Sequence, residues 1–262
     1  SLGRFHSPAL TPSASSQIST ALHRPNYLAT YTAHLAQLRA AHGEDAAMDL
    51  IVGGQSHAIG ILEHSLLATL GLKPTDTIVD VGCGSGRLST RLAPTHTGVF
   101  IGTDILSDLV EYAAKKAARP DWRFHVADQP PLPVEDGIAD FVCFFSVFTH
   151  LLDEDIYRYI EDAKRLLKPG GKLVFSYLDF AVATHWTMFE LTLADRSPDP
   201  VLNKFISKDA IHAWAQHLGL RVEQLHDGPT EWIDLIEPIT YIDGRQVSGR
   251  SYFGQSVAVV SK

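Results

Sequence analysis

The 262-residue sequence predicts an α/β fold in which helices cover both faces of a mostly parallel sheet. From residue 77 onward, short apolar runs of strand length alternate with longer segments of helical periodicity. The first run, residues 77–81, leads into a turn with glycines at positions 82, 84 and 86. The runs at 98–104 and 122–128 each close on an aspartate. Glycine turns and acids at strand ends are typical of sheets that bind nucleoside-containing ligands at their carboxyl edge.

Two helices are expected before the sheet begins. Residues 26–42 carry an apolar stripe with helical spacing. The stripe consists of Leu28, Tyr31, Leu35 and Leu38. The double glycine at 53–54 breaks the chain, and Ser56 can cap a second helix that runs to about Leu70. Residues 1–20 are rich in Ser, Pro and Thr, and they predict an arm that is loose or draped over the surface.

Five strands and three helices are expected in the alternating region. The strands lie near 77–81, 98–103, 122–126, 140–145 and 172–178, and the helices near 86–93, 106–118 and 154–167. Asp153 is a natural N-cap for the last of these helices, and Pro169 with the two following glycines terminates it.

Two long segments then interrupt the regular pattern, near 181–205 and 228–253. Between them, Ser207 caps another helix and residues 221–226 form a strand. The final apolar run, residues 255–260, predicts the last strand. Insertions of this length in compact domains are usually functional or disordered, so both are candidates for the walls of a substrate pocket.

Charge and composition exclude several classes of partner. The 22 basic and 30 acidic side chains give a net charge of −8 without a basic stripe, which argues against a nucleic-acid partner. No apolar stretch approaches the ~20 residues that span a bilayer, and residues 1–20 lack the apolar centre of a secretory signal. Cys83 and Cys143 are expected to be reduced thiols in the core, and we expect a cytoplasmic protein. The thirteen histidines show no metal-ligand spacing, so no metal site is expected.

The glycine turn has a direct physical use. Without Cβ atoms, its backbone can be pressed against a ligand. Asp104 follows Gly86 by 18 residues, and a carboxylate at that strand tip can accept hydrogen bonds from both ribose hydroxyls. Arg87 stands where the dinucleotide-binding pattern G-x-G-x-x-G has its last glycine, which argues against a nicotinamide cofactor.

These motifs together carry a resemblance to a known family. They are the segment 80–86, Asp104, Asp128 and the segments 140–146 and 165–172. In this series the sequence resembles the class I S-adenosylmethionine-dependent methyltransferases over about residues 57–226 and the last strand. The resemblance implies a Rossmann-like, doubly wound sheet of seven strands whose last strand is antiparallel. From the order of segments along the chain we expect an N-terminal arm and helical cap, residues 1–55, and a cofactor-binding domain, residues 56–262.

The resemblance implies S-adenosylmethionine as the cofactor. Gly82, Gly84 and Gly86 would line its methionine half, Asp104 would hold the ribose, and Asp128 would hold the adenine amino group. The expected cofactor-binding set is Asp80, Gly82, Cys83, Gly84, Gly86, Asp104, Ile105, Asp128 and Ser146.

His150 is the candidate catalytic residue. It follows the fourth strand, where the reacting end of a ligand lies in open parallel sheets, and its ordinary pKa suits a proton acceptor near neutrality. The alternative is a histidine that bonds a backbone carbonyl and shapes the turn. Cyclopropane fatty-acid synthases, which are similar to this fold, carry a Glu-His pair at this place, whereas this sequence has Thr149-His150.

Four further side chains are expected to bind the acceptor. They are Tyr177, His185, Trp186 and Trp232. The aromatic members could form an apolar pocket, and a plain core position is the alternative for each of them. His185 and Tyr177 are also the alternative proton acceptors.

The expected function is transfer of a methyl group to oxygen or nitrogen of a small molecule by in-line displacement. Two alternatives stay open at this point: a module that binds the cofactor without turnover, and an NAD-dependent oxidoreductase. The identity of the acceptor depends on loop conformation, which the sequence does not give. The oligomeric state is likewise not predicted.

Overall fold

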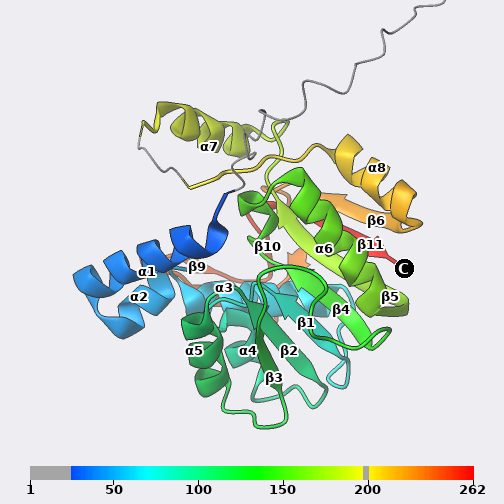
Figure 1. The fold of residues 1–262 in the computed structure, drawn as a ribbon, viewed down its shortest axis with the longest axis horizontal. Helices are drawn as coiled ribbons and strands as arrows, with labels where there is room; N and C mark the ends of the chain where they lie inside the picture. Colours follow the sequence, from blue (N-terminus) through cyan, green and yellow to red (C-terminus); the bar gives the residue numbers. More distant parts are fainter. Residues whose placement is uncertain (1–24, 197–200) are drawn as a thin grey trace, which may run out of the picture.

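The structure, a computed structural model, describes residues 25–196 and 201–262 (Figure 1). Its centre is a seven-stranded sheet with the strand order β3-β2-β1-β4-β5-β11-β6. The strands are β1 (Ile78–Val81), β2 (Phe100–Asp104), β3 (Arg123–Val126), β4 (Ala139–Phe144), β5 (Leu167–Tyr177), β6 (Arg221–His226) and β11 (Ser256–Ser261). The pairs among β1 to β5 are parallel, whereas β11 is antiparallel to both of its neighbours. The predicted mostly parallel sheet with an antiparallel last strand is confirmed. The arm predicted at 1–20 lies outside the described residues.

Helices cover both faces of this sheet because successive strand residues point to opposite sides. Val79 packs with the helices α6 (Asp153–Leu166) and α8 (Lys208–Leu218), whereas Ile78 packs with α3 (Ser56–Thr69) and α4 (Arg87–Leu92). The helix α5 (Ser107–Ala117) lies on the same face as α3 and α4 (Figure 1). This doubly wound arrangement leaves the carboxyl ends of β1, β2 and β4 open to a ligand.

The N-terminal helices α1 (Tyr27–His42) and α2 (Glu44–Leu50) form a cap beside α5. Leu35 of α1 and Met48 of α2 are buried together with Leu109 of α5. The predicted stripe is correct for Leu35, which is buried, but wrong for Leu28, which is 45% exposed in the first turn of α1. Helix α2 was not predicted, since seven residues give too few turns for a periodic signal.

Two predicted helix caps are wrong. Ser56 is the first residue of α3, and the Asp49 carboxylate accepts hydrogen bonds from the backbone N–H groups of Gln55 and Ser56. Asp153 is likewise inside α6, and its neighbour Leu152 donates its N–H to the Tyr27 hydroxyl. In both places a side chain of another helix, Asp49 of α2 or Tyr27 of α1, satisfies the start of the helix.

The two insertions contain regular structure that the sequence pattern did not predict. The first holds the helix α7 (Ala183–Ala194). The second holds four two-residue strands, β7 (Ile233–Asp234), β8 (Ile239–Thr240), β9 (Gln246–Val247) and β10 (Arg250–Ser251). They pair as β7 with β10 and β8 with β9, outside the main sheet. Strands this short carry no usable alternation of polar and apolar residues.

Both cysteines lie in the core. Cys83 and Cys143 are both free and buried, and burial raises the pKa of each thiol well above its ordinary value. Among the described residues, no helix is long and apolar enough to cross a bilayer.

Candidate active site

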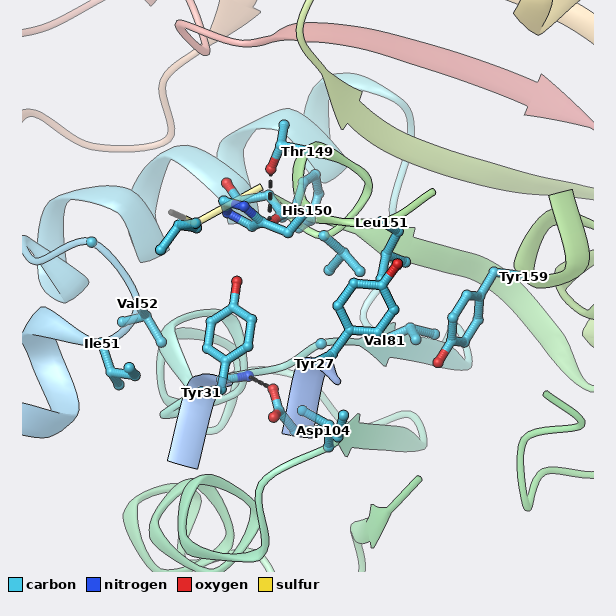
Figure 2. A pocket seen from close by; sticks show the side chains of 18 of the residues that line it. Tyr27, Tyr31, Ile51, Val52, Val81, Asp104, Thr149, His150, Leu151 and Tyr159 are labelled. Carbon is cyan, nitrogen blue, oxygen red and sulfur yellow. Dashed lines mark hydrogen bonds between the residues drawn. The ribbon is translucent and has the colours of Figure 1, made fainter. Parts of the chain in front are cut away.

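A cavity of about 1070 Å³ opens at the carboxyl ends of β1, β2 and β4 (Figure 2). Its floor is made by the strand ends and the glycine turn, and its roof by residues of α1 and of the loop after α2. Residues near the start of α7 and at 253–255 complete the wall. The two insertions and the N-terminal cap therefore meet the sheet at one place.

The glycine turn presents bare backbone to this cavity. Gly82 and Gly84 line it and have φ angles of +73° and +56°, in the left-handed region that disfavours side chains. A Cβ on Gly82 would collide with the side chain of Val147, and a Cβ on Gly84 would lie 2.6 Å from Val52 Cγ1. Gly86 does not line the cavity; it precedes α4, where a Cβ would press against Ala113.

Asp104 is held at the cavity floor by backbone donors. Its carboxylate accepts hydrogen bonds from the N–H groups of Gly84 and Leu106, both at 3.0 Å. Burial raises the pKa of Asp104, and these two hydrogen bonds oppose that rise. Next to it, the Thr103 hydroxyl is buried without a hydrogen-bond partner among the described residues. The cavity lining therefore includes a fixed acceptor, Asp104, and a hydroxyl, Thr103, that no described residue bonds.

The other expected cofactor residues divide into two groups. Ile105, Asp128 and Ser146 line the cavity with Gly82, Gly84 and Asp104. Asp80 and Cys83 are buried behind the cavity wall. Burial and the nearby Glu63 raise the pKa of Asp80 well above its ordinary value. The sequence therefore predicted the strand ends correctly, but the side chains of Asp80 and Cys83 are buried in the protein and not in the cavity lining.

His150 lies at the cavity wall in a single turn of 3-10 helix, Phe148–His150. Its Nδ1 lies 2.8 Å from the carbonyl oxygen of Leu202. Because a carbonyl can only accept, this contact requires a proton on Nδ1 and leaves a lone pair on Nε2. Burial lowers the pKa of His150 below its ordinary value, so the ring is neutral at pH 7.

Two tyrosines of α1 cover the cavity, and the sequence analysis did not identify them as site residues. The Tyr31 ring meets the His150 ring edge-on with centroids 6.2 Å apart, and its hydroxyl points toward His150 in Figure 2. Burial, helped by the charge of Asp104, raises the pKa of Tyr31 to about 12. Tyr27 donates a hydrogen bond to Asp155 at 3.2 Å. The signal that could have revealed them is the pair of tyrosines four residues apart on one helical face.

Arg87 joins the cap to the sheet domain. Its guanidinium donates to the carbonyl oxygen of Val52 at 2.8 Å and pairs with the Glu63 carboxylate at 3.0 Å. Glu63 is buried in α3, and burial raises its pKa while Arg87 opposes the rise. Arg87 stands where the dinucleotide-binding pattern has its last glycine. Here its side chain instead holds Val52 at the roof of the cavity.

Replacing Arg87 by methionine is expected to lower the free energy of unfolding by about 3 kcal/mol, because Glu63 is left buried without its partner. Proton uptake by Glu63 keeps the loss at the low end of the range for broken buried pairs. Thermal melting should show this loss for R87M and recovery of most of it for the double variant R87M/E63M. A melting temperature of R87M equal to that of wild type would contradict the assigned pair.

The four expected acceptor residues occupy different environments. His185 lines the cavity, but both of its ring nitrogens are engaged: Nδ1 accepts from the Asp179 N–H at 3.0 Å, and Nε2 lies 2.9 Å from the Gly254 carbonyl oxygen. Tyr177 is fully buried in the core and does not line the cavity. Trp186 is 45% exposed on α7, and Trp232 stacks on His226 with centroids 3.9 Å apart. Both ring nitrogens of His185 are therefore engaged, whereas no described residue forms a hydrogen bond with Nε2 of His150.

Further residues reach the cavity from elements whose position the sequence does not give. They include Val52, Tyr159, Met188, Asn203, Phe253 and Gln255. No group of three or more His, Cys, Asp or Glu side chains among the described residues is arranged to hold a metal ion.

Comparison with known proteins agrees with this geometry. Residues 78–171 match a family model described as a methyltransferase domain. A malonyl-[acyl-carrier protein] O-methyltransferase of Hahella chejuensis is 31% identical over 181 residues, which are 68% of this chain and 61% of that protein. A 27-O-demethylrifamycin SV methyltransferase of Amycolatopsis mediterranei is 32% identical over 43% of this chain and 42% of that protein. The chain thus spans less than two thirds of the length of these relatives.

Solved structures show the same fold. The crystal structure of magnesium protoporphyrin IX methyltransferase from Synechocystis PCC 6803, with bound SAH, superposes with a TM-score of 0.58 at 16% identity. The superposition covers 90% of this chain and 96% of the other. Together with the family match, the strand order and the glycine turn, this shows that the chain belongs to the class I S-adenosylmethionine-dependent methyltransferases.

Proposed function

We propose that the protein transfers a methyl group from S-adenosylmethionine to an oxygen or nitrogen of a small molecule. One observation carries the proposal: a single cavity connects the bare glycine turn and the Asp104 carboxylate to the free nitrogen of His150. One end is suited to a nucleoside and the other to accepting a proton.

The residues at the floor fit the cofactor. Gly82 and Gly84 line the floor with backbone in the left-handed region, and they would hold its methionine half. Asp104 would accept hydrogen bonds from the ribose hydroxyls, and Asp128 would bind the adenine amino group. The unpartnered Thr103 hydroxyl adds a hydrogen-bonding group at this end. When bound, S-adenosylmethionine supplies an electrophilic methyl group for in-line displacement.

The remaining residues orient the acceptor and accept its proton. The Leu202 carbonyl fixes the ring of His150 so that Nε2 can take a proton from a hydroxyl or an ammonium group. Tyr31 and Val52 close the cavity from above and exclude water. Positioning of this kind can supply about 7–11 kcal/mol of the barrier reduction, so no metal is needed.

The acceptor is a small molecule rather than a macromolecule. A volume of about 1070 Å³ is at the upper end for ligand sites and accommodates a cofactor beside a medium-sized acceptor. Both relatives described above act at oxygen according to their names. We further propose that residues 1–55 act as the cap of a domain formed by residues 56–262, and that the protein works in the cytoplasm without nucleic acid.

Two measurements test the proposal. Isothermal titration with S-adenosylmethionine should show one site per chain, and titration with NAD should show none. Incubation with tritiated S-adenosylmethionine and an extract of small molecules should then transfer label. Tight binding without any transfer would favour a cofactor-binding module, and binding of NAD alone would favour an oxidoreductase; either result would overturn the proposal.

A further inference from the structure

Helix α7 lies at the outer edge of the molecule, away from the helices that cover the sheet (Figure 1). Of its twelve residues, His185 alone is buried. Six large apolar side chains on α7 and the flanking chain are exposed, and we call them the α7 patch: Phe180, Trp186, Met188, Leu191, Leu193 and Val201. Glu190 is the one acidic residue of the helix, which has no Lys or Arg. Met188 and Leu191, three residues apart, lie on one side of the helix, whereas Trp186 and Leu193 lie on the other. Exposed apolar side chains gathered beside a cavity can mark a binding site.

The helix is held in place by aromatic contacts with Phe205. Phe180 stacks on Phe205 with ring centroids 4.6 Å apart, and Phe189 meets Phe205 edge-on at 5.4 Å. The hydrogen bond between His185 and the Gly254 carbonyl oxygen fixes the start of the helix to the cavity wall. The patch is therefore a defined apolar surface attached to the site.

The patch is continuous with the inside of the cavity. Met188 and Val201 line the cavity and are also 43% and 45% exposed. Leu50, on the α2 side, is likewise part of the lining and 41% exposed. Apolar side chains from α7, from the chain after it and from the end of α2 are thus both exposed and part of the lining. An apolar chain that leaves the cavity past Met188 would contact apolar side chains as it passes onto α7.

From this continuity we propose that the methyl acceptor is an amphipathic molecule, with a nucleophilic head beside His150 and an apolar tail that leaves past Met188 and lies on the α7 patch. The inference rests on the proposed function, since it names the class of molecule that the same cavity methylates. In this proposal α7 determines specificity, because the cavity recognises the head of the acceptor and the α7 patch recognises its tail. Each methylene group of the tail that is buried on the patch is expected to lower the dissociation constant by a factor of up to about four.

The test uses 4-ethylphenol and 4-octylphenol as probes in the presence of S-adenosylhomocysteine. Their dissociation constants are measured by calorimetry for wild type, Leu191→Glu and Val99→Glu. Leu191 is 65% exposed in the patch and does not line the cavity, whereas Val99 is 39% exposed and precedes β2 at the opposite end of the sheet. Circular dichroism and thermal melting of each variant establish that it is folded.

Wild type and V99E should bind 4-octylphenol at least about tenfold more tightly than 4-ethylphenol, and L191E should lose most of that difference. Equal affinity for the two phenols, or the same preference in L191E as in V99E, would overturn the inference. A dimer of wild type that becomes monomeric in L191E, seen by light scattering, would assign the patch to a second copy and also overturn it. Binding of S-adenosylhomocysteine, measured first, separates a failure of this inference from a failure of the proposed function.

Discussion

Replacing Asp104 by alanine is expected to weaken binding of S-adenosylmethionine about 100-fold or more. Two hydrogen bonds from ribose hydroxyls to a buried carboxylate contribute about 1.5–3 kcal/mol each, and both are lost. Calorimetric titration of the variant measures the loss directly. The matched control is Asp121→Ala, which removes an exposed carboxylate that pairs with Arg119 outside the cavity, and its affinity should equal that of wild type.

Asp104 also accepts the N–H groups of Gly84 and Leu106, so alanine could act by loosening the turn. Asp104→Asn separates the two effects, because its amide keeps one acceptor oxygen and the side-chain shape. We expect an affinity for D104N between those of wild type and D104A. Wild-type affinity in both variants would show that the ribose is bound elsewhere.

Replacing His150 by asparagine is expected to lower the rate of methyl transfer by about 10²–10⁴, the usual contribution of a positioned general base. The asparagine amide can still donate to the Leu202 carbonyl from nearly the place of Nδ1, but it offers nothing at the place of Nε2. The rate is measured with tritiated S-adenosylmethionine under saturating conditions, and cofactor affinity should stay unchanged. A rate close to wild type in H150N would assign His150 to shaping the turn, which is the alternative that the sequence left open.

The pH profile gives a second measurement of the same role. If His150 is the base, as proposed, transfer requires its neutral ring, and burial places the pKa of His150 below the ordinary value of 6.5. The rate should therefore be constant above pH 6.5 and fall as the pH drops below it, through the lowered pKa. In H150N this acidic limb should disappear. A limb that persists in the variant would belong to a different group.

The sequence predicted the sheet well because the strands obey local rules. The run at 77–81 is bounded by a threonine and a glycine turn, and it is found as β1 with the same end. Strands buried on both faces read as continuous apolar runs, and the helices between them show a clear apolar stripe, as in α6.

The site was predicted where it depends on strand ends and was missed where it depends on tertiary contacts. Asp104 and Gly84 follow from their place after a strand. Tyr31 reaches the cavity because α1 packs on α5, an arrangement that no local pattern specifies. Tyr177 was expected at the acceptor but lies in the core, since alternation along β5 decides which face each side chain joins.

The central claim is that one cavity holds the adenosyl group on Asp104 and turns the reacting end of the cofactor toward His150. A crystal structure of the protein with S-adenosylhomocysteine tests it most directly. The account predicts ribose hydroxyls within hydrogen-bond distance of the Asp104 carboxylate, the amino-acid part against Gly82 and Gly84, and the sulfur facing Nε2 of His150. A ligand bound outside this cavity, or a sulfur directed away from His150, would contradict it.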